Sequence, residues 1–314
     1  MKTISIVVPA YNEEEGLPAF HQALHRVLSE LSGKYQFEII YVLDRSRDDS
    51  IVTLRKIAAT DPDVTVLHLS RRFGHQLSLL AGIDHSHGDA VIMMDCDLQH
   101  PPALLPKLLE LYEQDYDVVQ TIREYDRTTG LLKRILSDFF YRIQNALSPI
   151  EIESGAADFR LISSRVADLF RNRIREQNPF LRGLFRWVGY KRVTVRFVSP
   201  PRAAGETKYR LKQLLAFSIA GITSFSKVPL RIGSLLGIVI SFLSLIYGVV
   251  IAAQYFILGH FPPGYASLVI SILFIGGLQL MVLGFVGEYL GSIFDEVKGR
   301  PLYLVDEVVH GKPE

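Results

Sequence analysis

The sequence has little cysteine and almost no net charge, and each of these features argues against a class of protein. Cys96 is the only cysteine among the 314 residues, which excludes a disulfide framework within one chain and a cysteine-rich zinc site. The 34 basic and 33 acidic side chains give a net charge of +1, so electrostatics gives no reason to expect a nucleic-acid partner. The charged residues are, however, unevenly distributed along the chain.

Charged side chains are missing from one long segment near the C-terminus. Residues 232–287 contain no Asp, Glu, Lys or Arg. Two apolar blocks, about 232–258 and 265–288, flank a turn-forming sequence rich in glycine and proline at 259–264. Each block exceeds the roughly 20 residues that cross a bilayer, and neither has a polar face. We therefore expect a transmembrane two-helix hairpin, with a pair of buried core helices as the alternative.

Basic residues around the hairpin predict its orientation. Lys227 and Arg231 precede the first block, Lys298 and Arg300 follow the second, and the connecting turn has no basic residue. Both ends of the hairpin should therefore face the cytoplasm.

The chain then divides into four parts. We expect a cytoplasmic domain at 1–210, a juxtamembrane part at 211–231, two transmembrane helices within 232–290, and a cytoplasmic tail at 291–314. Residues 212–226 read as an amphipathic helix in the membrane interface, with an ordinary core helix as the alternative. The polar residues 308–314 are expected to be disordered.

Strand and helix signals alternate through the N-terminal domain. Strands are predicted at 4–8, 37–42, 64–69 and 90–94, and helices at 12–31, 48–60 and 76–86. The helix at 12–31 would begin with an acidic first turn, and Asp48 or Asp49 would cap the helix at 48–60. This order predicts the α/β class, with a doubly wound, mostly parallel sheet.

Polar turns follow each of the four predicted strands, at residues 9–13, 44–48, 71–76 and 95–97. Ligands in doubly wound sheets bind at the carboxyl ends of the strands. Any one of these turns could be a solvated loop, but together they indicate a cleft of nucleotide size.

Two carboxylates stand one residue apart after the strand at 90–94. In extended backbone Asp95 and Asp97 would point to the same side, where their charges repel unless a cation lies between them. Mg²⁺ or Mn²⁺ bridging a diphosphate is the natural candidate, because these ions prefer carboxylate and phosphate oxygens. The alternative is a solvated turn before Pro101 and Pro102.

Several segments together carry a resemblance to a known family. They are Val7-Val8-Pro9-Ala10-Tyr11-Asn12-Glu13-Glu14, Asp44-Arg45-Ser46-Arg47-Asp48-Asp49-Ser50, Arg72-Phe73-Gly74-His75-Gln76, Met94-Asp95-Cys96-Asp97-Leu98-Gln99-His100-Pro101-Pro102, Arg202-Ala203-Ala204-Gly205-Glu206-Thr207-Lys208-Tyr209, and Gly299-Arg300-Pro301-Leu302-Tyr303. On these residues the chain resembles the family-2 glycosyltransferases of the GT-A fold. Within them it resembles the polyprenyl-phosphate glycosyltransferases, which include dolichol-phosphate mannose synthases and bactoprenol glucosyltransferases; the apolar hairpin favours the latter.

The resemblance implies a role for individual residues. Residues that would bind the nucleotide sugar are Pro9, Ala10, Tyr11, Glu13, Asp44, Gln76, Asp95, Gln99, Arg202 and Lys208. Asp95 and Asp97 would also hold Mg²⁺ or Mn²⁺. Residues that would bind the acceptor phosphate are Arg123, Arg127, Lys133 and Ser137. Asp158 would be a catalytic base or a ligand of a sugar hydroxyl, with a capping or turn aspartate as the alternative. Leu43, Arg45 and His100 depart from the family pattern.

The resemblance also implies a reaction and its partners. The chain would be an inverting transferase that moves a sugar from a nucleotide sugar to polyprenyl (undecaprenyl) phosphate, for glycosylation of the cell envelope. UDP-glucose is the first choice of donor, GDP-mannose the second, and a UDP-aminoarabinose derivative the third. The protein would lie in the bacterial cytoplasmic membrane, with both termini cytoplasmic, as a homo-oligomer that could be a tetramer.

Two other functions remain open. A processive polysaccharide synthase would carry a Gln-x-x-Arg-Trp motif, whereas the comparable stretch here, Gly183-Leu184-Phe185-Arg186-Trp187, lacks the Gln. A non-catalytic membrane scaffold that only binds a nucleotide sugar is the second alternative.

Overall fold

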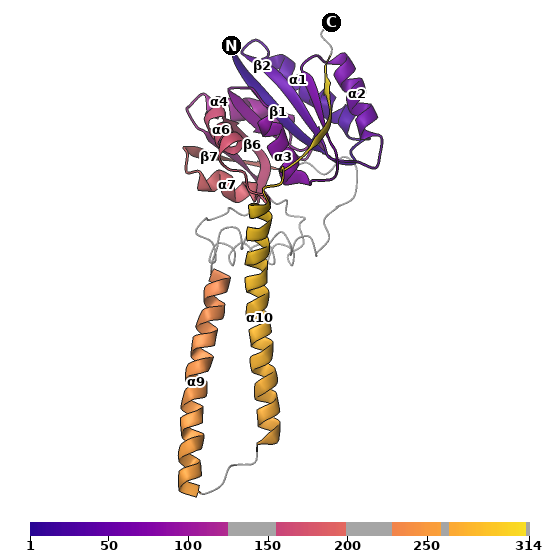
Figure 1. Cartoon of the computed structure of the whole chain (residues 1–314). Helices are drawn as coiled ribbons and strands as arrows, with labels where there is room; N and C mark the ends of the chain where they lie inside the picture. Colours follow the sequence, from indigo (N-terminus) through magenta and orange to yellow (C-terminus); the bar gives the residue numbers. More distant parts are fainter. Residues whose placement is uncertain (125–154, 199–227, 259–263, 312–314) are drawn as a thin grey trace.

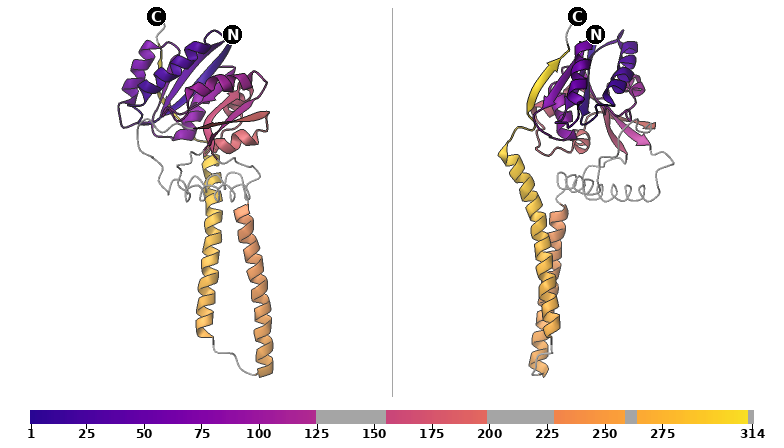
Figure 2. Two further views of the ribbon diagram at one scale, coloured as in Figure 1. Left: turned by 180° about the vertical axis from the view of Figure 1, so that it is seen from behind. Right: turned by 90° about the vertical axis from the view of Figure 1, so that its right-hand side faces the viewer.

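The computed structural model describes residues 1–124, 155–198, 228–258 and 264–311. These residues form an α/β domain, from one end of which two long helices extend side by side (Figures 1 and 2). The strands are β1 (Lys2–Ala10), β2 (Tyr35–Leu43), β3 (Val64–Leu69), β4 (Ala90–Met93), β5 (Val118–Glu124), β6 (Ala156–Ser163), β7 (Arg192–Val198) and β8 (Val305–His310). The helices are α1 (Leu17–Leu31), α2 (Ser50–Thr60), α3 (His75–Asp84), the short 3-10 helix η1 (Pro102–Leu104), α4 (Leu105–Tyr112), α6 (Ser164–Asn172), α7 (Leu181–Trp187), α9 (Val228–Leu258) and α10 (Tyr265–Lys298).

One sheet runs through the α/β domain, in the order β7-β5-β6-β4-β1-β2-β3-β8. Strands β1, β2, β3 and β4 are parallel, and β5 is parallel to β7. Strand β6 runs antiparallel to both β4 and β5, and β8 runs antiparallel to β3. The predicted α/β class and mostly parallel sheet are confirmed.

Helices cover both faces of this sheet, because the central strands are apolar on both sides. On one face Ile4, Ile6 and Val8 of β1 belong to a core that includes buried residues of α1, α2 and α4. On the other face Val7 belongs to a core that includes residues of α3, α6 and α7. Helix α3 lies so close to β1 that a Cβ on Gly82 would fall 2.1 Å from Val7 Cγ1. Glycine at this position therefore sets the spacing between helix and sheet.

The start of the first helix differs from the prediction. Helix α1 begins at Leu17, not at residue 12, with Gly16 as its N-cap and no acidic residue in its first turn. Asn12 has a φ of +51°, which a right-handed helix cannot contain. The carbonyl of Glu13 accepts hydrogen bonds from the N–H groups of Gly16 and Leu17. The acidic residues thus form a turn that precedes the helix.

The C-terminal segment also differs from the prediction. Residues Val305–His310 form β8, which pairs with β3 at the edge of the sheet. The expectation of disorder from residue 308 is therefore wrong for residues 308–310. Side-chain contacts hold this strand to α2 and to the turn after β2, through Arg55 with Glu307 (2.5 Å) and Arg45 with Asp306 (3.6 Å). The strand covers an edge that would otherwise expose unpaired backbone groups.

Two long helices occupy the positions of the predicted apolar blocks. Within α10, residues Ile270–Lys298 are long and apolar enough to cross a membrane. Helix α9 packs against it where Gly233 approaches Val282; a Cβ on Gly233 would lie 3.3 Å from Val282 Cγ2. The predicted amphipathic helix at 212–226 lies outside the described residues.

Hydrogen bonds connect the end of α10 to the α/β domain. The backbone N–H of Gln177 donates to Glu296 Oε1 (2.7 Å), and its side-chain amide donates to the carbonyl of Arg300 (2.6 Å). Beyond the helix, the Tyr303 hydroxyl donates to Asp84 Oδ2 (2.8 Å), which Arg175 Nη1 also contacts (2.9 Å). Strands β1–β4 run toward this end of the domain (Figure 1). The carboxyl edge of the sheet therefore faces the two long helices.

Candidate active site

Asp44 joins two of the predicted polar turns. It follows β2, is buried, and accepts hydrogen bonds from the backbone N–H groups of Phe73 and Gly74, both at 2.8 Å. The N–H of Arg45 is a third donor, at 3.2 Å. Gly74 has a φ of +95°, a backbone conformation that only glycine adopts without strain. The carboxylate and this glycine together fix the turn after β3 against the end of β2.

The turn after β1 is tied to the same place. Backbone N–H groups of Asn12 and Glu13 donate to the hydroxyls of Ser46 and Ser50, both at 3.0 Å. Within the predicted nucleotide site, Pro9 and Ala10 are the last residues of β1, and Tyr11 follows them. The Arg72 guanidinium lies 4.2 Å from the centre of the Tyr11 ring. Three of the four predicted turns thus meet at one edge of the sheet.

Asp95 lies in the fourth turn, beside two histidines. Its Oδ1 is 2.8 Å from His75 Nε2, and its Oδ2 is 3.5 Å from His100 Nδ1. Burial raises the pKa of Asp95, but the neighbouring His100 and His75 outweigh that effect and lower it to about 2. Asp95 is therefore a carboxylate at every physiological pH.

The geometry of Asp95 and Asp97 differs from the prediction in one respect. Strand β4 ends at Met93, and Leu98 has a φ of +60°, so the two carboxylates belong to a turn and not to extended backbone. Asp97 Oδ1 accepts a hydrogen bond from the N–H of Gln99 at 3.0 Å. The turn, and not the period of a strand, sets where these carboxylates point.

His100, which departs from the family pattern, lies between the Asp95 turn and the core residue Phe159. It is buried, its Nδ1 accepts a hydrogen bond from the backbone N–H of Asp95 (2.9 Å), and its ring stacks on Phe159 with centroids 5.2 Å apart. Burial lowers the pKa of His100, against the opposing effect of Asp95. The hydrogen bond from the backbone N–H of Asp95 to this ring holds the Asp95 turn in place.

Asp158 lies among cations. Its Oδ1 accepts hydrogen bonds from Arg160 Nη2 and Arg182 Nε, both at 3.0 Å, and its Oδ2 accepts from Arg182 Nη2 at 2.8 Å. His75 Nδ1 is 3.9 Å from Asp158 Oδ2, so His75 stands between Asp158 and Asp95. Burial raises the pKa of Asp158, but Arg182, His75 and Arg160 together hold it well below its usual range. Such a carboxylate is a weak base.

Two predicted glutamines make defined contacts. Gln76 Oε1 accepts a hydrogen bond from the backbone N–H of Leu181 (3.2 Å), at the start of α7. Gln99 Oε1 accepts one from Arg123 Nη2 (2.7 Å). Arg123, predicted to bind the acceptor phosphate, therefore lies next to a residue predicted to bind the nucleotide sugar.

Other predicted site residues lie outside the described part of the chain. They are Arg127, Lys133, Ser137, Arg202 and Lys208. Three described residues of the site had no assigned role in the sequence analysis: His75, Arg160 and Arg182. His75 stands in one of the motifs given above. Arg160 could have been noticed as a basic residue within a largely apolar run. Arg182 carried none, because only the fold places α7 beside β6.

The residues at the site fit the chemistry of Mg²⁺ or Mn²⁺. Within the described residues no group of three or more His, Cys, Asp and Glu side chains is arranged to hold a metal ion. Mg²⁺ needs no such group, because one or two carboxylates and the phosphates of a substrate commonly hold it. Asp95, ionised at neutral pH, and Asp97, partly exposed in the same turn, are donors of that kind.

Comparisons with known proteins agree with these features. Residues 5–170 match the family described as Glycosyl transferase family 2. The chain is 39% identical over 310 residues to an SfII prophage-derived bactoprenol glucosyl transferase of Shigella flexneri, covering 99% of each chain. It is 39% identical over 303 residues to YkcC, an uncharacterized glycosyltransferase of Bacillus subtilis, covering 96% of this chain and 93% of that one.

Solved structures are more distant. Glucosyl-3-phosphoglycerate synthase from Mycobacterium tuberculosis, crystallised with Mn²⁺, uridine diphosphate and glucosyl-3-phosphoglycerate, is 21% identical to this chain. The match covers 71% of this chain and 78% of that one, with a TM-score of 0.44.

Proposed function

Because this chain belongs to glycosyl transferase family 2, we propose that it transfers glucose from UDP-glucose to polyprenyl phosphate, with inversion at the anomeric carbon. The observation that carries the proposal is that one segment contacts three carboxylates: Phe73 and Gly74 donate to Asp44, and His75 lies beside both Asp95 and Asp158. Near-full-length similarity to bactoprenol glucosyl transferases supports the choice of donor and acceptor.

The turns after β1, β2 and β3 are assigned to the nucleoside. Tyr11, Glu13 and Asp44 would line this pocket beside Pro9 and Ala10, with Gln76 nearby. The fixed turn at Gly74, held by two backbone hydrogen bonds to Asp44, pre-forms the pocket. Pre-formed sites lose less entropy when they bind.

Asp95 and Asp97 are assigned to the diphosphate end of the donor. They would hold Mg²⁺ or Mn²⁺, which neutralises negative charge as it develops on the leaving diphosphate. His75 and the backbone contact to His100 fix Asp95 in the turn before substrate arrives. Gln99 would lie beside the sugar, and Arg202 and Lys208 over the phosphates.

The acceptor needs little help from a base. A phosphate monoester has a second pKa of about 6 and is an anion near neutral pH. One of its oxygens forms a bond to the anomeric carbon while the bond from that carbon to the diphosphate oxygen breaks and UDP leaves. No proton has to move. Asp158, held as a carboxylate by Arg160 and Arg182, is better suited to orient those arginines or a sugar hydroxyl than to act as a base.

Attack by one anion on another must be assisted by cations. Arg123, Arg127, Lys133 and Ser137 are our candidates for the acceptor phosphate. Arg123 reaches Gln99, so at least this residue stands at the junction of the sugar and acceptor positions. Membrane attachment would bring the lipid to the site, with α9 and α10 spanning the bilayer and the α/β domain in the cytoplasm.

The test is release of UDP from UDP-glucose by the detergent-purified protein, with and without polyprenyl phosphate and divalent metal. We expect release that requires both the lipid and the metal and that falls by at least about a thousandfold in Asp97→Ala. Arg26→Gln, on the exposed face of α1, is the matched control and should leave the rate unchanged. Release with GDP-mannose but not with UDP-glucose would change the proposed donor to GDP-mannose. Release without lipid would contradict the proposed lipid acceptor. Binding of UDP-glucose without turnover would favour a scaffold.

A further inference from the structure

One motif of the chain has no part in the proposed function. Residues 299–303, Gly-Arg-Pro-Leu-Tyr, directly follow α10. Gly299 ends that helix with a φ of +57°, a conformation that favours glycine, and Pro301 cannot continue a helix. Together with Leu304 these residues form a connector, residues 299–304, between α10 and β8 (Figure 1).

The connector contacts a segment that carries much of the proposed site. That segment, residues 70–84, comprises the turn after β3 and helix α3. Within it, residues 73–75 contact three carboxylates of the site: Asp44, Asp95 and Asp158. The place of these three residues therefore decides how the carboxylates are arranged before a donor binds.

The connector contacts residues 70–84 at both ends. At one end the backbone N–H of Ser70 donates to the carbonyl of Leu304 (2.9 Å). At the other end the Tyr303 hydroxyl donates to Oδ2 of Asp84, the last residue of α3, at 2.8 Å. A segment that is held at both ends leaves fewer positions open to the residues between them.

Side-chain packing adds to these hydrogen bonds. Leu302 is 8% exposed and belongs to the core that Phe73 packs against. The ring of Tyr303 lies 6.0 Å from the ring of His85, the residue after α3. Burial and the hydrogen bond to Asp84 raise the pKa of Tyr303, so its hydroxyl keeps the proton that it donates at physiological pH.

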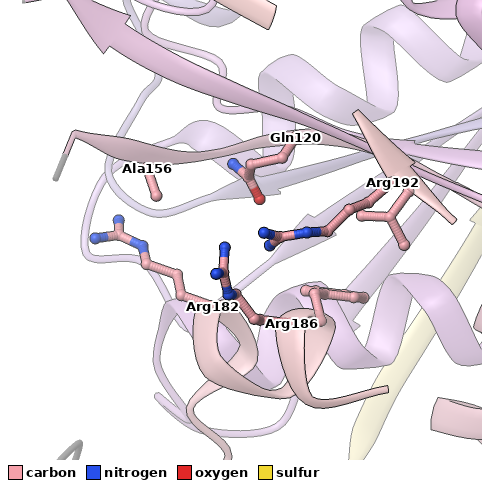
Figure 3. Close-up of a pocket in the computed structure, with 7 residues that line it drawn as sticks. Gln120, Ala156, Arg182, Arg186 and Arg192 are labelled. Atoms are coloured by element: carbon pink, nitrogen blue, oxygen red, sulfur yellow. The ribbon is translucent and has the colours of Figure 1, made fainter. Parts of the chain in front are cut away.

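A second route joins the end of α10 to the same helix. Gln177 makes two hydrogen bonds to residues at the end of α10 and just beyond it. Four residues later, the N–H of Leu181 donates to Oε1 of Gln76 in the first turn of α3 (3.2 Å). Arg182 comes next, and Figure 3 shows it extending from α7 toward the strand that carries Ala156. Helix α3 is thus tied to α10 at its first turn and, through the connector, at its last residue.

We propose that the connector positions the donor site, with Tyr303 as a positioning residue that acts through α3 on residues 73–75. The use of this site for a UDP-sugar rests on the proposed function; the positioning itself rests on the contacts of Leu302, Tyr303 and Leu304. Because the connector begins where α10 ends, donor binding is coupled to the attachment of the α/β domain to the long helices.

Hydrogen exchange tests the positioning without any ligand. In detergent-purified full-length protein, Tyr303→Phe keeps the ring and loses the hydrogen bond to Asp84. Arg175 still contacts both oxygens of that carboxylate (2.7 and 2.9 Å), so the variant should fold. Amides of residues 70–76 should exchange about fivefold faster or more than in the wild-type protein, because a weaker hold on α3 lets this turn open locally.

Tyr35→Phe is the matched control. The Tyr35 hydroxyl also donates to a carboxylate, that of Glu113 (3.2 Å), but Tyr35 begins β2 and lies away from the carboxyl edge of the sheet. Its removal should leave exchange at residues 70–76 unchanged. Equal exchange at these residues in wild type and Tyr303→Phe would overturn the proposal. An equal acceleration throughout the α/β domain would also overturn it, since that result would show only a general loss of stability.

Donor binding gives a second measurement. UDP affinity in the presence of Mn²⁺, measured by calorimetry, should fall about fivefold or more in Tyr303→Phe and stay unchanged in Tyr35→Phe. Because such coupling is reciprocal, UDP should slow exchange at residues 302–304 of the wild-type protein. Glu307→Gln removes a contact between β8 and α2 and should leave UDP affinity unchanged. Equal UDP affinity in wild type and Tyr303→Phe would overturn the assignment of the connector to the donor site.

Kinetics separate this proposal from the proposed function. In an active protein Tyr303→Phe should raise KM for UDP-glucose about fivefold and leave KM for polyprenyl phosphate unchanged. If the wild-type protein bound no UDP, the proposed function would fail, whereas hydrogen exchange would still decide whether the connector positions residues 73–75. A rise in KM for polyprenyl phosphate alone would assign the connector to the acceptor and overturn the proposal.

Discussion

Two buried carboxylates at the same edge of the sheet are held by different kinds of donor. Asp44 is 3% exposed and accepts from three uncharged backbone N–H groups, all from the turns that follow β2 and β3. Asp158 is 6% exposed and is held by two guanidinium groups, one from its own strand and one from α7. The half of the site that we propose for the nucleotide is thus built from backbone hydrogen bonds between turns, whereas the half around Asp158 is built from ion pairs.

Removing Asp158 should cause the larger loss of stability. Asp158→Ala leaves the buried Arg160 without its counter-charge, and breaking a buried ion pair in this way costs about 3–5 kcal/mol. The thermal midpoint of the detergent-purified protein should fall by about 10 °C. Asp158→Asn, which keeps the shape and an acceptor oxygen, should lose less. A midpoint within a degree of wild type would show that Arg160 finds another partner.

Removing Asp44 should lower the stability less than removing Asp158 does, and it should weaken nucleotide binding more. Asp44→Ala leaves neutral N–H donors unsatisfied, which costs about 1–3 kcal/mol. The thermal midpoint should fall less than in Asp158→Ala, while UDP affinity, measured by calorimetry, should drop at least about tenfold because the turn at Gly74 is released. A fall in stability as large as that of Asp158→Ala would contradict the difference in stabilisation that we infer between Asp44 and Asp158.

The smallest effect should appear in the pH dependence of stability. Burial lowers the pKa of His75, but Asp95 and Asp158 outweigh it and raise the pKa above its usual value. A raised pKa contributes stability that is complete below the unfolded value of about 6.5 and is lost as pH rises through the folded value. Asp95, with a pKa of about 2, loses its contribution only as pH falls from about 4 through about 2.

Thermal midpoints at pH 6 and pH 9, without divalent metal, measure this effect. The wild-type protein should lose more stability over that interval than His75→Gln does, because the carboxylates do not titrate there. Equal losses in the two proteins would show that His75 is not charged in the folded protein at pH 6.

The strands were predictable because buried parallel strands are short apolar runs. The prediction for β3 matches the structure at both ends, and those for β1 and β2 are only shorter than the observed strands. The start of α1 was wrong because three glutamates look like the first turn of a helix, whereas Gly16 and Pro18 begin it. Strand β8 was missed because its alternating pattern becomes a strand only beside the edge of β3.

For the site, the sequence placed the polar turns but not the contacts between them. Asp44 was found because it directly follows an apolar strand, and Asp95 and Asp97 because they lie in the turn after another. The hydrogen bonds from Phe73 and Gly74 to Asp44 join residues that are 29 and 30 positions apart in the chain. The placement of His75 between Asp95 and Asp158 depends equally on the fold, because His75 begins α3, whereas Asp95 follows β4 and Asp158 lies in β6.

By itself, the sequence determined the α/β class, the order of the first strands, the apolar C-terminal blocks and the carboxylates that end the strands. These are local properties, since apolar periodicity and chain order are written in neighbouring residues. Tertiary structure alone decided that β8 returns to the sheet and that Arg160 and Arg182 share Asp158. These contacts join residues far apart in the chain, and only packing against a common sheet brings them within hydrogen-bonding distance.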